Sequence, residues 1–228
     1  LVTAPICKES AHRGGLRFPG HTEYLAHKAG TEQVAMMMAG PRLKVILATT
    51  HIPLTQVAPT LAQMDLAGLM QLACRSLRDE FGMECPTLAV AGLNPHAGEA
   101  GAFGDEEARI LTPAICRAQE ELESAGLHAK ITGPHSPDTL FWKALQGGPD
   151  AVLALYHDQG LIASKILDLH DTVNVTLGLP FIRTSPDHGV AYELMGTGEA
   201  RPDSFCAAIR LGMEMHSRRR GASLPHWD

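Results

Sequence analysis

Short apolar runs alternate along the chain with longer segments whose apolar residues recur at helical spacing. Five runs lack regular polar alternation, as strands buried on both faces do, and they cover residues 43–48, 87–91, 129–132, 151–155 and 173–177. Between the first two runs, apolar residues keep near-helical spacing from Val57 to Phe81, and Gly82 is placed to end that helix. This order predicts a βαβ unit, and the alternation along the whole chain predicts an α/β fold.

Two further helices are expected in the second half of the chain. One should open at the carboxylates of 105–107, which suit the positive end of a helix dipole, and close at Gly126. The other should span about 204–216. The polar tail at 217–228 carries three consecutive arginines and is expected to be a frayed, solvated end. No repeat or linker marks an internal boundary in residues 1–228.

Composition narrows the class of protein. The 228 residues are 45% hydrophobic and 19% charged, which is typical of a soluble globular enzyme. A net charge of −6 excludes a broad basic surface for nucleic acid but allows a local site for one phosphate. Five cysteines without a C-x-x-C pair indicate reduced thiols, and no apolar run reaches the roughly 18 residues that a membrane span needs. We therefore expect a cytoplasmic location and neither secretion nor membrane insertion.

Polar clusters lie in four Gly- and Pro-rich loops that follow predicted strands, where open α/β sheets bind ligands. The loops cover residues 19–23, 48–54, 92–99 and 156–160. His21, His96 and His157 are each expected on a turn, beside a carboxylate or amide that could fix the imidazole tautomer. Three imidazoles suit zinc or a similar divalent ion and leave positions open for substrate oxygens.

Two other readings of these loops remain open. The three histidines could be ordinary hydrogen-bonded loop residues, since their spacing matches no helical zinc motif. Alternatively, the neighbouring carboxylates of Glu23, Glu99 and Asp158 could hold a hard cation in place of the histidines. Periodicity does not choose between these hypotheses.

A second candidate cluster consists of Lys165, Asn174 and Arg183. An ammonium, an amide and a guanidinium fork are the groups that a phosphate monoester or carboxylate needs. The alternative is a surface lysine, a turn asparagine and an arginine in a structural ion pair. No G-x-G-x-x-G or Walker A loop occurs, so a standard Rossmann nucleotide site is not predicted.

Seven long motifs resemble, in order and spacing, the 4-hydroxythreonine-4-phosphate dehydrogenase family. They are T-A-P-x-x-K at 3–8, G-H-T-E at 20–23, A-T-T-H-I-P-L at 48–54, G-L-N-P-H-A-G-E at 92–99, G-P-x-x-x-D-T-x-F at 133–141, Y-H-D-Q-G at 156–160 and V-N-V-T-L-G-L-P-F-I-R-T-S-x-D-H-G at 173–189. The resemblance extends to about residue 215. Members of this family are longer at the amino terminus, and Leu1-Val2-Thr3 reads as the tail of a strand, so an upstream segment is expected to be missing.

The resemblance implies a fold, an assembly and a site. The fold is isocitrate/isopropylmalate-dehydrogenase-like, with two α/β lobes around a cleft, and residues 1–228 form one catalytic region of it. The assembly is a homodimer whose active site is shared between subunits. The site residues carried over are the metal ligands His21, His96 and His157, drawn from both subunits, and the substrate contacts Lys165, Asn174 and Arg183.

The resemblance also implies a reaction. NAD or NADP takes hydride from C3 of 4-phosphohydroxy-L-threonine, and the β-keto acid then loses carbon dioxide to give 3-amino-2-oxopropyl phosphate, a step of pyridoxal phosphate biosynthesis. A divalent ion, Zn, Mg or Co, polarises the reacting oxygen. Asp158 is the candidate for proton transfer or for orienting His157.

Two other functions fit the same residues. A paralogous dehydrogenase of 4-phosphoerythronate or 4-phosphothreonate would use the same ion, cofactor and phosphate site, although A-T-T-H-I-P-L at 48–54 favours the vitamin B6 enzyme. A truncated chain could instead be an inactive metal-binding dimer module.

Overall fold

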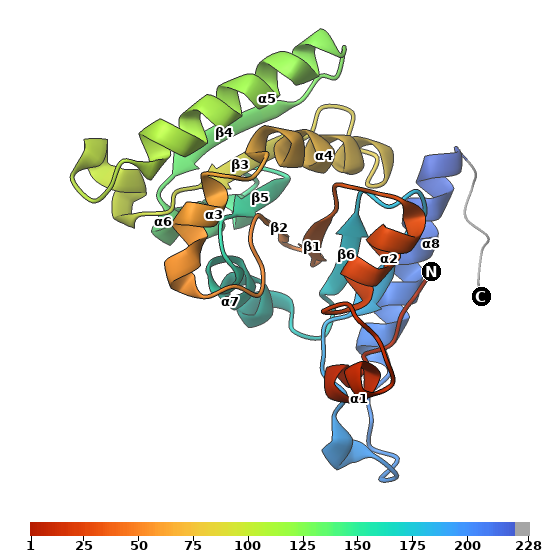
Figure 1. The fold of residues 1–228 in the computed structure, drawn as a ribbon. Coiled ribbons are helices and arrows are strands. Elements are labelled where there is room, and N and C mark those ends of the chain that lie inside the picture. The colour runs from red at the N-terminus through yellow and green to blue at the C-terminus, as the bar shows by residue number, and fades with distance from the viewer. Residues whose placement is uncertain (222–228) are drawn as a thin grey trace.

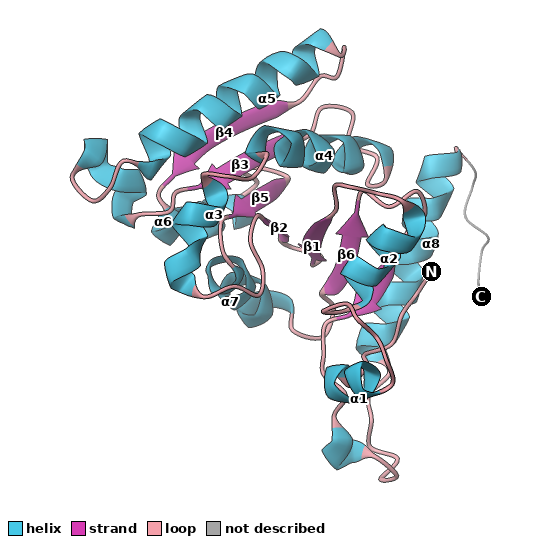
Figure 2. Ribbon diagram, in the orientation of Figure 1, coloured by secondary structure: helices cyan, strands magenta, loops and turns pink. Residues whose placement is uncertain are grey.

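A single mixed sheet of seven strands runs through the protein in the computed structural model, which describes residues 1–221. The strand order is β4-β3-β5-β2-β1-β6-β7 (Figures 1 and 2). The strands are β1 (Ala35–Ala39), β2 (Lys44–Leu47), β3 (Thr87–Ala91), β4 (Lys130–His135), β5 (Ala151–Ala154), β6 (Val173–Leu177) and β7 (Thr184–Pro186). The predicted α/β class is confirmed, and each of the five predicted strands is present within a few residues of its expected bounds.

The direction of the strands changes in the middle of the sheet. β4, β3, β5 and β2 are mutually parallel, whereas β1 is antiparallel to β2 and to β6, and β7 is antiparallel to β6. Two strands at this antiparallel end, β1 and β7, were not predicted. β1 has the sequence Ala-Met-Met-Met-Ala, and these residue types favour helices, so its burial between two neighbouring strands overrides local preference.

Helices cover both faces of the sheet. They are α1 (Lys8–Arg13), α2 (His21–Ala29), α3 (Val57–Leu61), α4 (Leu66–Asp79), α5 (Thr112–Ser124), α6 (Pro137–Leu145), α7 (His157–Asp168) and α8 (Asp203–Arg220). The core on one face packs side chains of α4, α5 and α8 against the strands, and the core on the other face uses α6 and α7. None of the helices within residues 1–221 is long and apolar enough to cross a membrane.

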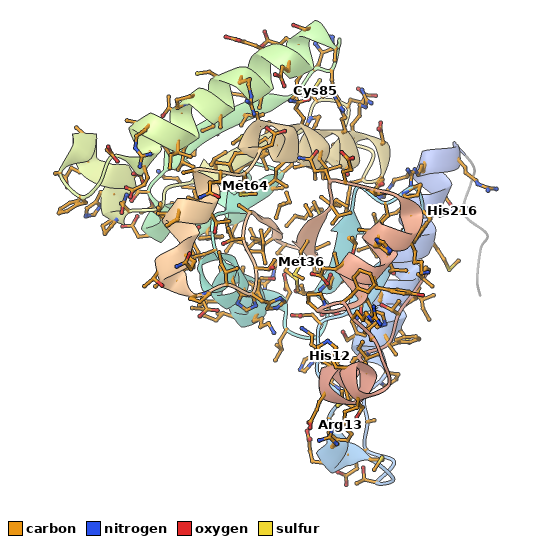
Figure 3. All side chains as sticks on the ribbon, in the orientation of Figure 1. His12, Arg13, Met36, Met64, Cys85 and His216 are labelled. Carbon is orange, nitrogen blue, oxygen red and sulfur yellow. The ribbon has the colours of Figure 1, made fainter. Side chains whose placement is uncertain are left out.

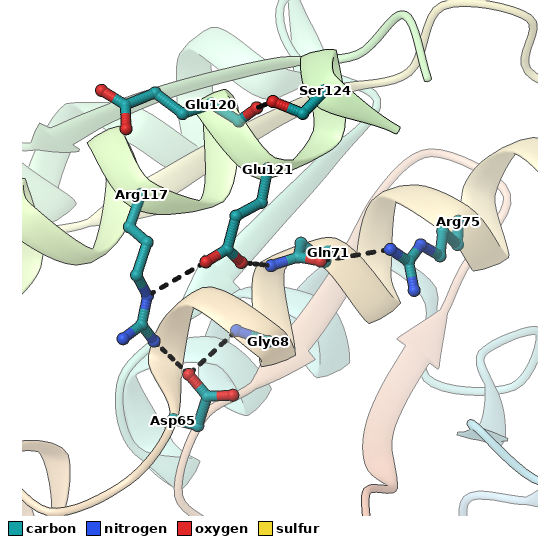
Figure 4. A network of polar contacts seen from close by, with 8 residues as sticks. All are labelled: Asp65, Gly68, Gln71, Arg75, Arg117, Glu120, Glu121 and Ser124. Carbon is teal, nitrogen blue, oxygen red and sulfur yellow. Dashed lines mark hydrogen bonds and ion pairs between the residues drawn. The ribbon is translucent and has the colours of Figure 1, made fainter. Parts of the chain in front are cut away.

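The helix predicted from Val57 to Phe81 is in fact two helices, α3 and α4. The chain breaks at 62–65 because the Asp65 carboxylate accepts a hydrogen bond from Gly68 N at 3.2 Å and so starts a new helix. The same carboxylate pairs with Arg117 of α5, and Gln71 bonds Glu121, so this capping residue also ties α4 to α5 (Figure 4). A local polar group thus decides the break that apolar spacing alone did not show.

Two other expectations need correction. The helix expected from 105 begins as a π-helical turn over Glu107–Leu111 before α5 starts at Thr112. The tail expected to fray at 217 continues α8 to Arg220, where Gly221 ends the helix in a left-handed conformation with φ of 62°. The rest of that tail, 222–228, lies outside the described residues.

Candidate active site

A cavity of about 340 Å³ lies at the antiparallel end of the sheet. Met36 of β1, which lies near the middle of the molecule in Figure 3, forms part of its wall together with Asn174 of β6. Segments from both ends of the chain close it, since 4–8, 19–23 and 185–189 all contribute lining residues. A larger hollow of about 650 Å³ beside α8 is lined mainly by apolar side chains and contains none of the predicted site residues.

Five of the seven predicted site residues line this cavity: His21, His157, Lys165, Asn174 and Arg183. His21 and His157 do not lie on turns as expected, because each is the first residue of a helix, α2 and α7 respectively. Extended residues precede both, with φ of −174° at Gly20 and −145° at Tyr156. The remaining two, His96 and Asp158, lie outside the cavity lining.

His157 is oriented by its sequence neighbour. Its Nδ1 lies 2.7 Å from Oδ1 of Asp158, whose side chain is 73% exposed. A carboxylate at Nδ1 favours the tautomer with the proton on Nδ1, which leaves the Nε2 lone pair free for a ligand. This contact allows Asp158 to hold the His157 ring in one orientation.

His51 is a cavity residue that sequence reasoning missed. Its ring centroid lies 5.5 Å from that of His157, and its loop follows β2. Burial lowers the pKa of His51, and the charges of Lys8 and His157 lower it further. The loop at 48–54 is one of the four predicted polar clusters, so a signal is present, but the spacing of its residues does not favour this histidine over His21.

His21 differs from His51 in the charged residue that affects its pKa. Burial lowers its pKa first, and the positive charge of Arg183 lowers it further. Cationic side chains thus lower the pKa of both histidines, Arg183 for His21 and Lys8 for His51.

Arg183 is a buried cation without a carboxylate partner. Only 4% of the residue is exposed, and it donates to Thr3 Oγ1 from Nη2 at 2.6 Å and to Thr176 Oγ1 from Nη1 at 3.1 Å. Within residues 1–221 no carboxylate lies within 4 Å of the guanidinium. Burial lowers the pKa of Arg183, and Glu23 opposes this. A guanidinium held by two neutral hydroxyls at a cavity wall favours an anionic ligand.

Lys165 and Asn174 complete the polar wall. Lys165 Nζ lies 3.3 Å from Oδ2 of Asp187, a residue that sequence reasoning had not singled out. Burial raises the pKa of Asp187, and Lys165 opposes this. The Oδ1 atom of Asn174 is buried and has no hydrogen-bond partner within the described part of the chain. Such an atom is a natural acceptor for a donor on a bound molecule.

His96 lies on a strained turn. From His96 to Ala100 the backbone is left-handed, with φ between 41° and 82°. Four of these five residues are not glycine, and each costs roughly 1–2 kcal/mol in this conformation. The His96 side chain is exposed beside Phe103, with ring centroids 6.3 Å apart. Within residues 1–221 no three His, Cys, Asp or Glu side chains converge on one point where an ion could bind.

The family described as "Pyridoxal phosphate biosynthetic protein PdxA" matches residues 1–212 of this sequence. The chain belongs to this family. Among PdxA relatives, the 4-hydroxythreonine-4-phosphate dehydrogenase of Desulfosudis oleivorans is 52% identical over 214 residues, which cover 94% of this chain and 62% of that protein. The chain thus spans somewhat less than two thirds of the length of this relative.

Solved structures agree with the PdxA assignment. The 4-hydroxythreonine-4-phosphate dehydrogenase of Klebsiella pneumoniae superposes with a TM-score of 0.82 at 47% identity, over 94% of this chain and 62% of that one. A terephthalate 1,2-cis-dihydrodiol dehydrogenase from Burkholderia xenovorans LB400 gives a TM-score of 0.69 at 26% identity, over 98% of this chain and 67% of that one. The PdxA fold is therefore shared with a dehydrogenase whose name refers to a different substrate.

Proposed function

We propose that the chain is the catalytic part of an NAD(P)- and divalent-metal-dependent dehydrogenase that oxidises 4-phosphohydroxy-L-threonine at C3. Decarboxylation of the product then gives 3-amino-2-oxopropyl phosphate, for pyridoxal phosphate biosynthesis. Relatives that carry the name 4-hydroxythreonine-4-phosphate dehydrogenase support the reaction. The observation that carries the substrate class is Arg183, a buried guanidinium at the cavity wall without a carboxylate partner in residues 1–221.

The substrate phosphate binds Arg183 and Lys165 in this proposal. A guanidinium fork offers two parallel donors to a phosphate, and an ammonium adds a point charge. Asn174 lies on β6 in the same cavity, and its unpartnered Oδ1 accepts a hydrogen bond from a hydroxyl or ammonium group of the substrate. These three contacts fix the substrate at its phosphate end and leave the rest of the molecule toward the histidines.

We propose that the metal is bound by His157 and His51 of one subunit and by His96 of the other. The alternative ligand set has His21 in place of His51, as the family resemblance in the sequence implies. Metal–nitrogen bonds to imidazole are about 2.1 Å long, so one ion fits between two rings with centroids 5.5 Å apart. The free Nε2 of His157 supports this reading, because Asp158 occupies Nδ1. The influence of Arg183 on His21 supports a place for His21 near the phosphate.

The position of His96 supports the proposal of a homodimer with a shared site. This histidine is exposed on the 95–101 turn and does not line the cavity that holds the other two imidazoles. Exposed apolar side chains near the site supply surface for a second copy, since Ile162 and Ile166 of α7 are 60% and 78% exposed. These residues flank Lys165, so a partner that covered them would lie directly beside the cavity.

The residues divide the work of the proposed reaction. When bound, the ion supplies electrophilic polarisation of the reacting oxygen, and the nicotinamide accepts the hydride. Asp158 holds the His157 ring, and Arg183 with Lys165 anchors the substrate so that C3 has one position. The five cysteines are free, which accords with a cytoplasmic enzyme.

The test is reduction of NAD or NADP by the purified protein with Co²⁺, Zn²⁺ or Mg²⁺ after addition of 4-phosphohydroxy-L-threonine. We expect turnover in the wild type and none in His96→Ala, with His51→Ala and His21→Ala compared to decide which of these two histidines is the metal ligand. Equal turnover by His96→Ala would contradict the metal assignment. Turnover only with 4-phosphothreonate or 4-phosphoerythronate would assign the substrate of the paralogue, and metal binding without any turnover would indicate an inactive dimer module.

A further inference from the structure

The loop that carries His96 needs something to hold its shape. Left-handed backbone is unfavourable for residues with a Cβ, and His96, Ala97, Glu99 and Ala100 all adopt it, with φ of 53°, 53°, 41° and 54°. Such a conformation persists only where the surrounding structure imposes it. The exposed imidazole at the start of this turn is therefore positioned by contacts elsewhere in the loop.

Glu107 supplies those contacts. Its carboxylate is buried, with 5% of the residue exposed, and Oε1 accepts hydrogen bonds from Leu93 N at 2.8 Å and Asn94 N at 2.7 Å. Its Oε2 accepts a third from Asn94 Nδ2 at 3.0 Å. Burial acts to raise the pKa of Glu107, but the bonds from Asn94 and Leu93 outweigh it, so the pKa lies below its usual value.

No cation shares this carboxylate. Within residues 1–221 no Lys, Arg or His nitrogen lies within 4 Å of Glu107, so its buried charge is balanced by amide donors of the 93–94 segment together with its own backbone N–H. A buried carboxylate without a cation depends on such amide donors to remain ionised, so the charge of Glu107 and the shape of the 93–94 segment are coupled. The π-helical turn Glu107–Leu111 starts at this residue, and such turns occur frequently at functional sites.

The far side of the same carboxylate contacts the left-handed turn itself. A Cβ added to Gly98 would lie 2.8 Å from Glu107 Oε2, and one added to Gly92 would lie 2.9 Å from Ala97 Cα. The two glycines thus let the turn close down onto the carboxylate. Glu107 holds the loop on both sides of His96, through hydrogen bonds at 93–94 and through close packing at Gly98.

We propose that Glu107 is a positioning residue that locks the 92–100 loop in its left-handed turn and thereby presents His96 to the metal shared with a second subunit. The part of this inference that concerns the metal rests on the proposed function. The contacts between Glu107 and the loop are independent of that function.

The test compares wild type, Glu107→Gln and the matched control Asp105→Asn in the full chain. Asp105 lies two residues earlier with a 69% exposed side chain, and its contact is a surface pair with Arg109. The amide of Glu107→Gln keeps the volume but presents donors to the donor Asn94 Nδ2. We expect Co²⁺, measured by visible absorption and calorimetry, to bind roughly 10–100-fold more weakly to Glu107→Gln and with unchanged affinity to Asp105→Asn.

Two further readouts separate positioning from general stability. Amide hydrogen exchange at 93–100 should be faster in Glu107→Gln, while exchange in the sheet and the far-ultraviolet circular dichroism match the wild type. If Glu107→Gln does not fold, Asn94→Ala removes the Nδ2 bonds to Glu107 Oε2 and Glu106 Oε2 but keeps the backbone bonds to Glu107, and it should weaken Co²⁺ binding roughly threefold or more. Equal Co²⁺ affinity or equal loop exchange in folded variants would overturn the inference. A wild type that binds no Co²⁺ would instead refute the proposed metal, and loop exchange would still decide the role of Glu107.

Discussion

Lys165 Nζ lies 3.3 Å from Asp187 Oδ2, and this ion pair joins α7 to the segment that follows β7. The aspartate side chain is 15% exposed and the lysine side chain 42%, so the carboxylate is the buried partner. The pair lies in the cavity wall beside Arg183. Lys165 therefore stabilises the fold through its ion pair with Asp187, and it also lies where it could contact an anionic ligand.

Removal of this lysine should make stability depend more strongly on pH. In Lys165→Met the pKa of Asp187, already raised by burial, should rise further because its cation is gone. The unfolded state ionises Asp187 near its usual pKa, so the variant loses stability relative to wild type as pH rises above about 4. We expect a loss of about 1 kcal/mol at pH 8, because the lysine is partly exposed, and almost none at pH 3.5. Urea denaturation at both values measures it, and a constant deficit at both would contradict the coupling.

Inorganic phosphate should stabilise the protein through Arg183. A dissociation constant on the order of 1 mM would give about 2 kcal/mol at roughly 20 mM phosphate, which raises Tm by several degrees. The rise should vanish in Arg183→Gln and persist in Arg201→Gln, where the arginine side chain is 66% exposed. Thermal denaturation at matched ionic strength is the measurement. An unchanged rise in Arg183→Gln would place the anion elsewhere.

Gly160 sets how closely α7 approaches the sheet. A Cβ at this position would lie 2.6 Å from Val45 Cγ1 and 2.9 Å from Leu47 Cδ2, so Gly160→Ala should cost about 1–3 kcal/mol and lower Tm by roughly 3–10 °C. Because α7 also carries His157 and Lys165, the affinities of Gly160→Ala for the proposed substrate and metal should fall as well. Gly14→Ala is the control, since its Cβ would have only ordinary contacts at 3.4 Å. Equal Tm values for the two variants would argue against tight packing of α7.

Glu80 should make the wild type less stable at high pH. Burial raises its pKa to about 7, although Arg219 at 3.8 Å opposes this. A raised folded pKa means that stability falls as pH rises from about 4.5, the ordinary value, to about 7 and stays low above it. Glu80→Gln should therefore exceed wild type by up to about 2 kcal/mol at pH 8 and match it near pH 4.5. Glu84→Gln, at an exposed position, should change neither value; urea midpoints at both pH values provide the check.

The parts of the fold that sequence predicted are those with strong local patterns. The strand Thr87–Ala91 is a continuous β-branched and apolar run, the strand Val173–Leu177 is interrupted only by Asn174, and both have the expected bounds. The strand Ala35–Ala39 was missed because methionine and alanine do not favour strands locally, and only its pairing with β2 and β6 makes it one. The break at Asp65 was missed because a capping side chain leaves the apolar spacing unchanged.

The sequence predicted only those site residues that lie within recognisable motifs or clusters. The loop motifs and the second candidate cluster predicted His21, His157, Lys165, Asn174 and Arg183, and the structure brings these five into one cavity. Nothing in the spacing could show that His51 lies beside His157, since 106 residues separate them and only the β2–β5 pairing brings their loops together. The role of Glu107 was equally hidden, because its partners lie 13 and 14 residues earlier in a loop without regular structure.

The bond between Arg183 and Thr3 joins residues 180 positions apart, and it has a consequence for how the protein is made. On the ribosome, Thr3 emerges long before its arginine exists, so the early part of the nascent chain cannot build the pocket alone. The anion-binding pocket is therefore complete only after Arg183 and the last strands, β6 and β7, have been translated and have packed onto the sheet. Incomplete translation products are therefore unable to compete for the phosphorylated metabolite that the finished chain is proposed to bind.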